Sequence, residues 1–125
     1  MRKTTGIKAG PLIHRITIQR PVVDRDDSGA PFVSEWREVA EVWAAIESLS
    51  GREWLASAEF RSDVTTRIRI RWRDDIDASM RVLYKNPRMG GTVVYGIAAV
   101  LPQFVGMSEL HLMCTAGAVT EGGQP

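Results

Sequence analysis

Residues 64–73 read VTTRIRIRWR, and this stretch carries the strongest strand pattern in the chain. Two interleaved sets alternate strictly along it: Val64, Thr66, Ile68, Ile70 and Trp72 against Thr65, Arg67, Arg69, Arg71 and Arg73. Successive side chains of a strand point to opposite faces, so the first set predicts a buried face and the second a polar one. We therefore expect Trp72 in the core and a row of arginines about 7 Å apart on the other face.

Similar alternation continues on both sides of this stretch. Residues 12–21 (LIHRITIQRP) predict a strand that ends at Pro21, and the turn formers of residues 23–31 (VDRDDSGAP) predict a hairpin loop. Residues 32–46 predict a long strand with a bulge near residues 38–40, where the alternation changes phase. Further strands are expected in MRVLY (80–84), TVVYGIAAVL (92–101) and ELHLMC (109–114). The fold class is mainly β, a small antiparallel β-barrel or sandwich.

One short helix is expected in a loop inserted before residue 64. In IESLSGREW (46–54), Ser50 and Glu53 have the spacing of a capping box, which marks a helix N-terminus. The residues that follow favour helix, and Trp54 lies among them. We predict a flexible N-terminal arm (1–10), a single domain (11–115) and a flexible C-terminal tail (116–125).

The overall composition limits the classes of function. The 125 residues include 16 basic and 15 acidic ones, a balance that argues against a protein that mainly coats DNA or an anionic membrane. A single cysteine excludes an intramolecular disulfide and suits a reducing compartment. No apolar run is long enough to span a bilayer, and the basic N-terminus lacks the apolar stretch of a signal peptide.

Residues that could perform catalysis or bind metal are scarce. His14 and His111 lie on separate predicted strands without other ligands at metal-binding spacing, so we expect a hydrogen-bonded His14 and an exposed His111. Cys114 is expected to be a small buried residue, since nothing nearby activates it as a nucleophile. The acidic residues 74–77 lack the EF-hand pattern and predict a solvated turn facing arginines. We predict no enzyme activity, no metal and no cofactor.

The arginine row, made of Arg67, Arg69, Arg71 and Arg73, is the best local candidate for a site. It could follow a nucleic-acid backbone, it could be neutralised by carboxylates such as Glu41 and Glu47, or it could pair with an acidic face of another subunit. The balanced charge favours the last two interpretations.

The tryptophans suggest that the sheet is covered on both faces. Trp36 and Trp72 fall in apolar registers, whereas Trp43 falls opposite Val42. Either the inserted helix or another subunit would then cover the second face. Tryptophan and arginine are also the residues that most often anchor interfaces.

Four segments resemble the phage head–tail joining protein family, also called head–tail adaptors or head-closure proteins. They are AGPLIHRITIQRP (9–21), VAEVWAAIESLSGREWLASAE (39–59), TTRIRIRWRDDIDASMRVLY (65–84) and YGIAAVLP (95–102). The similarity covers about residues 9–101 in the family's order, although the turn at 85–91 is longer and the end less charged than the family pattern.

The resemblance implies a small β-barrel with a helix-bearing inserted loop, which assembles as a ring on the portal or a preceding connector. Such a ring completes the head of a tailed phage or prophage and joins it to the tail, close to the DNA in the channel. It implies a virion protein, made in the bacterial cytoplasm, whose partners are the portal or connector ring, the tail proteins and copies of itself, with no cofactor and no membrane.

We expect the interface to involve Arg52 and Trp54 of the inserted segment together with the arginine row. The alternative is a small nucleic-acid-binding module that uses the Arg67–Arg73 strand with Trp43 or Trp54 as stacking platforms.

Overall fold

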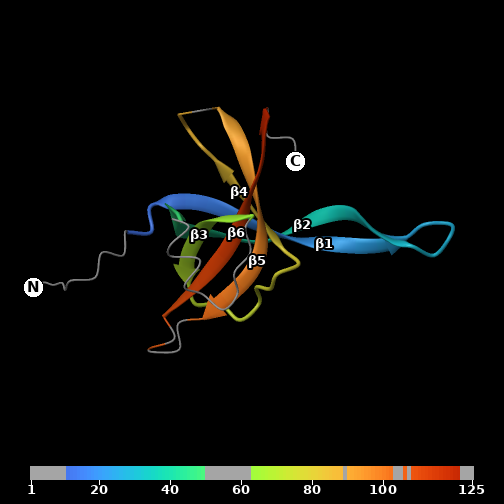
Figure 1. The fold of residues 1–125 in the computed structure, drawn as a ribbon, viewed down its shortest axis with the longest axis horizontal. Helices are drawn as coiled ribbons and strands as arrows, with labels where there is room; N and C mark the ends of the chain where they lie inside the picture. The colour runs from blue at the N-terminus through green and yellow to red at the C-terminus, as the bar shows by residue number, and fades with distance from the viewer. Residues whose placement is uncertain (1–10, 50–62, 89, 103–105, 107, 122–125) are drawn as a thin grey trace, which may run out of the picture.

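The computed structural model describes residues 11–49, 63–88, 90–102, 106 and 108–121, with side chains as far as residue 115. Its elements are β1 (His14–Arg25), β2 (Pro31–Ser48), β3 (Val64–Arg71), β4 (Arg81–Lys85), β5 (Gly91–Pro102) and β6 (Glu109–Glu121). These strands form one antiparallel sheet in the order β1-β2-β3-β6-β5-β4, and β4 pairs with β1, so that the order closes on itself (Figure 1). The prediction of a mainly β fold is confirmed. The described residues contain no helix, and the predicted helix lies outside them.

The core is built from one face of each strand of the closed sheet. Because side chains alternate, every second residue of β1, β3 and β6 points inward. The largest fully buried side chains are Ile16, Ile18, Ile68, Ile70, Val82, Leu112 and Cys114. Burying one such aliphatic side chain contributes about 1.5–3 kcal/mol, so these residues supply most of the stability of the sheet.

The first two strands extend well beyond the closed part of the sheet. β4 pairs with β1 only over Ile16–Gln19, and from Arg20 onward β1 pairs with β2 alone. The resulting two-stranded arm comprises residues 20–37 and projects from the rest of the sheet (Figure 1). At its tip, Gly29 adopts φ 88°, which favours glycine, and Asp26 accepts hydrogen bonds from the backbone N–H of Ser28 and Ala30, both at 2.9 Å.

The strand boundaries confirm one prediction and correct another. Ile18 pairs with Ala40 and Gln19 with Glu38, so Val39 is the extra residue of a bulge within the predicted range. Pro21, however, does not end β1. It lies opposite Trp36 in the arm, where β1 has a described neighbour on one side only, and an edge position tolerates the missing N–H of proline.

Trp72 does not lie in the core, contrary to the alternation of residues 64–73. It follows the last residue of β3, and the residue is 37% exposed. The β2–β3 pairs begin at Ala44 and Ile70, and the β3–β6 pairs begin at Arg71 and Glu109. Trp72 therefore lies beyond the paired part of β3, at an open end of the sheet, where it borders a hollow lined by Val100, Pro102 and Leu110. Trp36 is only half-buried.

The flexible C-terminal tail was predicted to begin at residue 116, which is earlier than the end of the last strand. β6 continues to Glu121, and its backbone pairs with the first half of β5, as far as Gly91 opposite Glu121. The small residues from 116 onward suggested a tail, but β5 offers them a strand to pair with. The boundary at residue 115 is therefore corrected.

Candidate functional site

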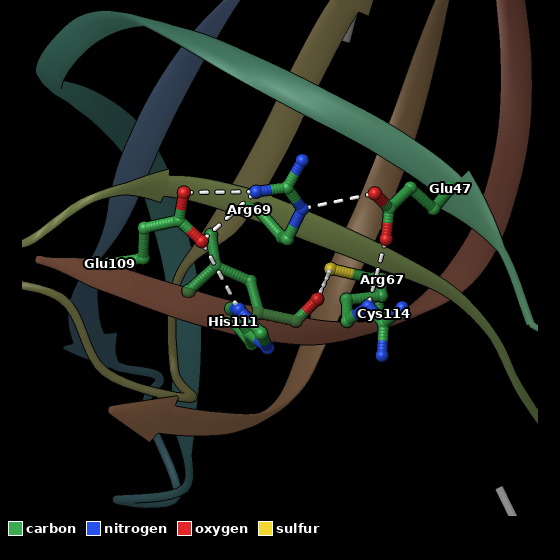
Figure 2. Close-up of polar contacts among 7 residues, drawn as sticks. Glu47, Arg67, Arg69, Glu109, His111 and Cys114 are labelled. Atoms are coloured by element: carbon green, nitrogen blue, oxygen red, sulfur yellow. Dashed lines mark hydrogen bonds and ion pairs between the residues drawn. The ribbon is translucent and has the colours of Figure 1, made fainter. Parts of the chain in front are cut away.

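The arginine row predicted from the sequence divides into an inner and an outer half. In the inner half, Arg67 Nε donates to Glu47 Oε1 at 2.9 Å, and Arg69 Nε donates to Glu47 Oε2 at 3.0 Å. Arg69 Nη1 also donates to both carboxylate oxygens of Glu109, at 3.0 and 2.9 Å. Figure 2 shows Arg69 on β3 between Glu47 of β2 and Glu109 of β6. The Arg69 side chain is 4% exposed.

The pKa shifts show that these charges stabilise one another. Burial alone would raise the pKa of Glu47, but hydrogen bonds from Arg67 and Arg69 outweigh it and hold the pKa below its ordinary value. Burial alone would lower the pKa of Arg69, but hydrogen bonds to Glu109 and Glu47 raise it. Both groups therefore stay ionised, and the pairs join three neighbouring strands.

Pairing within the sheet is thus confirmed for Glu47 but not for Glu41. Glu47 lies directly opposite Arg67 in the β2–β3 register. Glu41 precedes the first β2–β3 pair, and its carboxylate lies 3.7 Å from Arg15 Nε of β1 instead.

The two histidines and the cysteine lie in different surroundings. His14 Nδ1 lies 2.9 Å from the Tyr84 hydroxyl, which confirms a hydrogen-bonded histidine. His111 is not exposed as expected: it is half-buried beside Glu109, and burial lowers its pKa. Cys114 is buried as predicted, and burial raises the pKa of its thiol to about 12. Within the described ranges, no group of His, Cys, Asp and Glu could hold a metal ion.

The outer half of the row behaves differently. Arg71 is exposed and makes no ion pair with any described residue. Arg73 lies past the end of β3, and its guanidinium donates to both oxygens of Asp75, at 2.9 and 2.8 Å. This contact confirms an acidic turn that faces arginine, and it leaves Arg71 as the unpaired charge of the row.

Arg71 lies on an exposed aromatic surface at the open end of the sheet. Adjoining hollows of about 360, 420 and 320 Å³ all have Trp43 in their walls. Trp43 is 52% exposed, and the Arg15 guanidinium lies 4.9 Å from the centre of its ring. We call this region the Trp43 surface. It comprises Ile13, Arg15, Trp43, Arg71 and Trp72. Exposed tryptophan flanked by guanidinium groups is typical of binding surfaces.

The sequence indicated only part of this surface. Trp43 was expected on the outer face and lies there, whereas Ile13, 60% exposed, was not singled out. Its position before β1, out of phase with Ile16 and Ile18, was the available signal. Arg52 and Trp54 lie outside the described residues.

Comparison with known proteins identifies the family. The model of the phage head completion protein family matches residues 7–117. The chain belongs to the phage head completion protein family. The resemblance drawn from residues 9–101 is thereby confirmed. The function of this chain is that of a structural virion protein in head completion.

Two individual proteins are similar to most of this chain. Head completion protein gp7 of Enterobacteria phage HK97 is 29% identical over 112 residues, which cover 90% of this chain and 98% of the relative. The solution structure of protein SF1141 from Shigella flexneri 2a is 31% identical, with a TM-score of 0.68 over 90% of this chain and 98% of that one.

A less similar protein shares the same fold. A chain in the virion of a native gene transfer agent particle shares 18% identity and a TM-score of 0.61, over 90% of this chain and 100% of that one. At this identity the likeness concerns the fold. In the part of the head completion protein that the structure describes, no helix could cross a membrane.

Proposed function

We propose that this head completion protein assembles as a ring beneath the portal or a preceding connector, where it completes the filled head and joins it to the tail. The observation that carries the proposal is the family match, which spans residues 7–117. In this proposal the closed sheet is a small β-barrel, the ring surrounds the DNA channel, and the protein catalyses no reaction. It is made in the bacterial cytoplasm and ends in the virion.

The exposed surfaces support a function in assembly. A closed sheet with a buried core leaves few apolar side chains outside, yet Trp43, Trp72 and Ile13 are exposed together at one end. Exposed apolar groups that cluster in this way mark interaction surfaces. Arg71 is the member of the arginine row that we propose as a partner contact, together with Arg52 and Trp54 of the inserted segment.

The geometry does not favour a nucleic-acid-binding module. Such a module needs several free cations along the strand, because each phosphate contact uses one. Arg67 and Arg69 are held by Glu47 and Glu109, and Arg73 is held by Asp75. Among the described residues, Arg71 is the one arginine of the row without a carboxylate partner. One free guanidinium group is too little charge to follow a phosphate backbone.

Electron microscopy of the purified protein mixed with portal complexes tests the proposal. We expect a ring of added density on the portal, whereas the free chain is a monomer or weak oligomer. DNA affinity measured over a salt series serves as the contrast. A steep loss of affinity with salt, in the absence of any added ring, would indicate the nucleic-acid-binding function instead.

A further inference from the structure

The tip of the arm carries a second exposed apolar group, distinct from the Trp43 surface. Val23 is 57% exposed, Phe32 48% and Val33 45%. Val23 and Val33 are paired across the two strands, so they lie on one face, and Phe32 lies on the other. A narrow hairpin with apolar side chains on both faces has the shape of an element that inserts between other surfaces.

The net charges around the two groups are opposite, since three aspartates outweigh Arg25 at the tip. Asp24 and Asp27 lie at the tip, and neither makes an ion pair with a described residue. On the Trp43 surface, Arg71 likewise makes no described ion pair, and Arg15 has only a 3.7 Å contact with the exposed Glu41. An acidic tip with apolar side chains thus complements an apolar hollow bordered by guanidinium groups.

The two surfaces cannot meet within one chain. Arg15 and Asp24 belong to the same strand, β1, which pairs with β2 from His14 to Arg25. At a rise of about 3.3 Å per residue, the tip lies about 30 Å from the Trp43 surface. Figure 1 shows the arm projecting away from the end of the sheet at which β1 begins.

The base of the arm is held against the closed part of the sheet, so the tip has a defined direction. The Arg81 guanidinium lies over the ring of Trp36, 4.2 Å from its centre, and Arg81 Nε donates to Gln19 Oε1 at 2.8 Å. Arg81 begins β4, whereas Trp36 and Gln19 lie where the arm begins. A pre-oriented arm loses less conformational entropy when it binds.

We propose that the arm tip of one copy docks on the Trp43 surface of the next copy. Val23, Val33 or Phe32 packs against Trp43 and Trp72, and Asp24 or Asp27 pairs with Arg71. The contact joins two different surfaces, so it leaves one tip and one Trp43 surface free at the ends of any chain of subunits. Repetition closes such a chain into a ring when the rotation between neighbouring copies divides a full turn. This inference rests on the proposed ring and names the surfaces that form it.

Cysteine cross-linking tests this contact directly. The full-length chain carries Asp27→Cys, Arg71→Cys or both, and is oxidised over a concentration series and on portal complexes. Cys114 does not compete, because it is buried and its thiol pKa is about 12. We expect a ladder of covalent oligomers from the double variant, dimers from a mixture of the two single variants, and monomers from each single variant alone.

Charge reversal provides a second measurement. We expect Arg71→Glu, and separately Asp24→Arg with Asp27→Arg, to weaken self-association about tenfold, and their combination to restore it. Arg20→Glu is the matched control, since Arg20 is exposed on β1 and lies outside both surfaces. Circular dichroism and thermal melting confirm that each variant is folded.

The outcomes separate this inference from the proposed function. Rings on portal complexes without any cross-linked ladder overturn the tip-to-surface contact and leave the proposed function intact. Dimers from Asp27→Cys alone indicate a tip-to-tip contact and also overturn it. A ladder in solution without retention on portals supports the contact and rejects the proposed docking beneath the portal.

Discussion

The closed part of the sheet and the arm are built from the same two strands but differ in what covers them. In the closed part, Ile16 and Ile18 of β1 are fully buried, whereas Val23, farther along the same strand, is 57% exposed. β1 has partners on both sides at Ile16–Gln19 and only β2 as a partner beyond. All three side chains are aliphatic and β-branched, so the difference in burial comes from the surrounding strands.

This comparison indicates which side chains stabilise the monomer and which are available for association. Apolar area contributes to folding only where it is removed from water. The closed part therefore carries the folding free energy, and the arm retains apolar area that a partner can cover.

The largest expected difference is between Leu112→Ala and Phe32→Ala. Leu112 is fully buried, so truncation should lower the free energy of unfolding by about 2–5 kcal/mol. Phe32 is half exposed on the arm, so truncation should cost about 0.5 kcal/mol. Chemical denaturation of both variants measures these values. Similar losses in the two variants would contradict the division between the closed part and the arm.

The second prediction compares two members of the arginine row. Arg69→Met leaves Glu47 and Glu109 without this partner and should cost about 2 kcal/mol, because partly buried carboxylates lose charged hydrogen bonds. Arg71→Met, on the same strand, should change the free energy of unfolding by about 0.5 kcal/mol or less. Denaturant titration measures both. Equal effects would mean that the Arg69 network does not stabilise the sheet.

The third prediction concerns Trp72, at the edge of the closed part. With 37% of the residue exposed, Trp72→Ala should cost about 1–2 kcal/mol, below the 3–5 kcal/mol of a core tryptophan. Trp43→Ala, 52% exposed, should cost less still. Thermal melting of both variants checks the order. If Trp72→Ala costs as much as truncation of a core tryptophan, the register predicted from the sequence is right and Trp72 belongs to the core.

The smallest effect is a dependence of stability on pH that comes from His111 and Glu47 of the closed part. The folded chain holds the pKa of His111 below its ordinary value of 6.5, so the unfolded chain binds this proton first as the pH falls. Stability should therefore decrease below about pH 6.5. The folded chain also holds the pKa of Glu47 below 4.5. Its contribution to stability is therefore lost as the pH falls through this lowered pKa.

His111→Gln serves as the control for this pH dependence. It should remove the upper part of the decrease, which denaturation at several pH values would detect. An unchanged slope between pH 6.5 and 5 would assign the upper decrease to another group.

Much of the site was within reach of the sequence. The alternation in residues 64–73 correctly placed Ile68 and Ile70 inside, and Glu47 was named as a partner for the arginine row. Glu109 and Arg15 were missed, because their contacts depend on which strands become neighbours. Strand order and register are set by long-range pairing that local patterns do not contain.

Local side-chain chemistry was sufficient for the strands, for the bulge at Val39 and for the family, because alternation and short motifs are properties of neighbouring residues. It was not sufficient for the ends of the elements. Pro21 continues β1 and β6 runs to Glu121, since each has a neighbouring strand for its backbone. Trp72 leaves the core because it lies past the end of β3, beside a hollow at the open end of the sheet. Burial is a property of what packs against a residue, and only the assembled sheet supplies that neighbour.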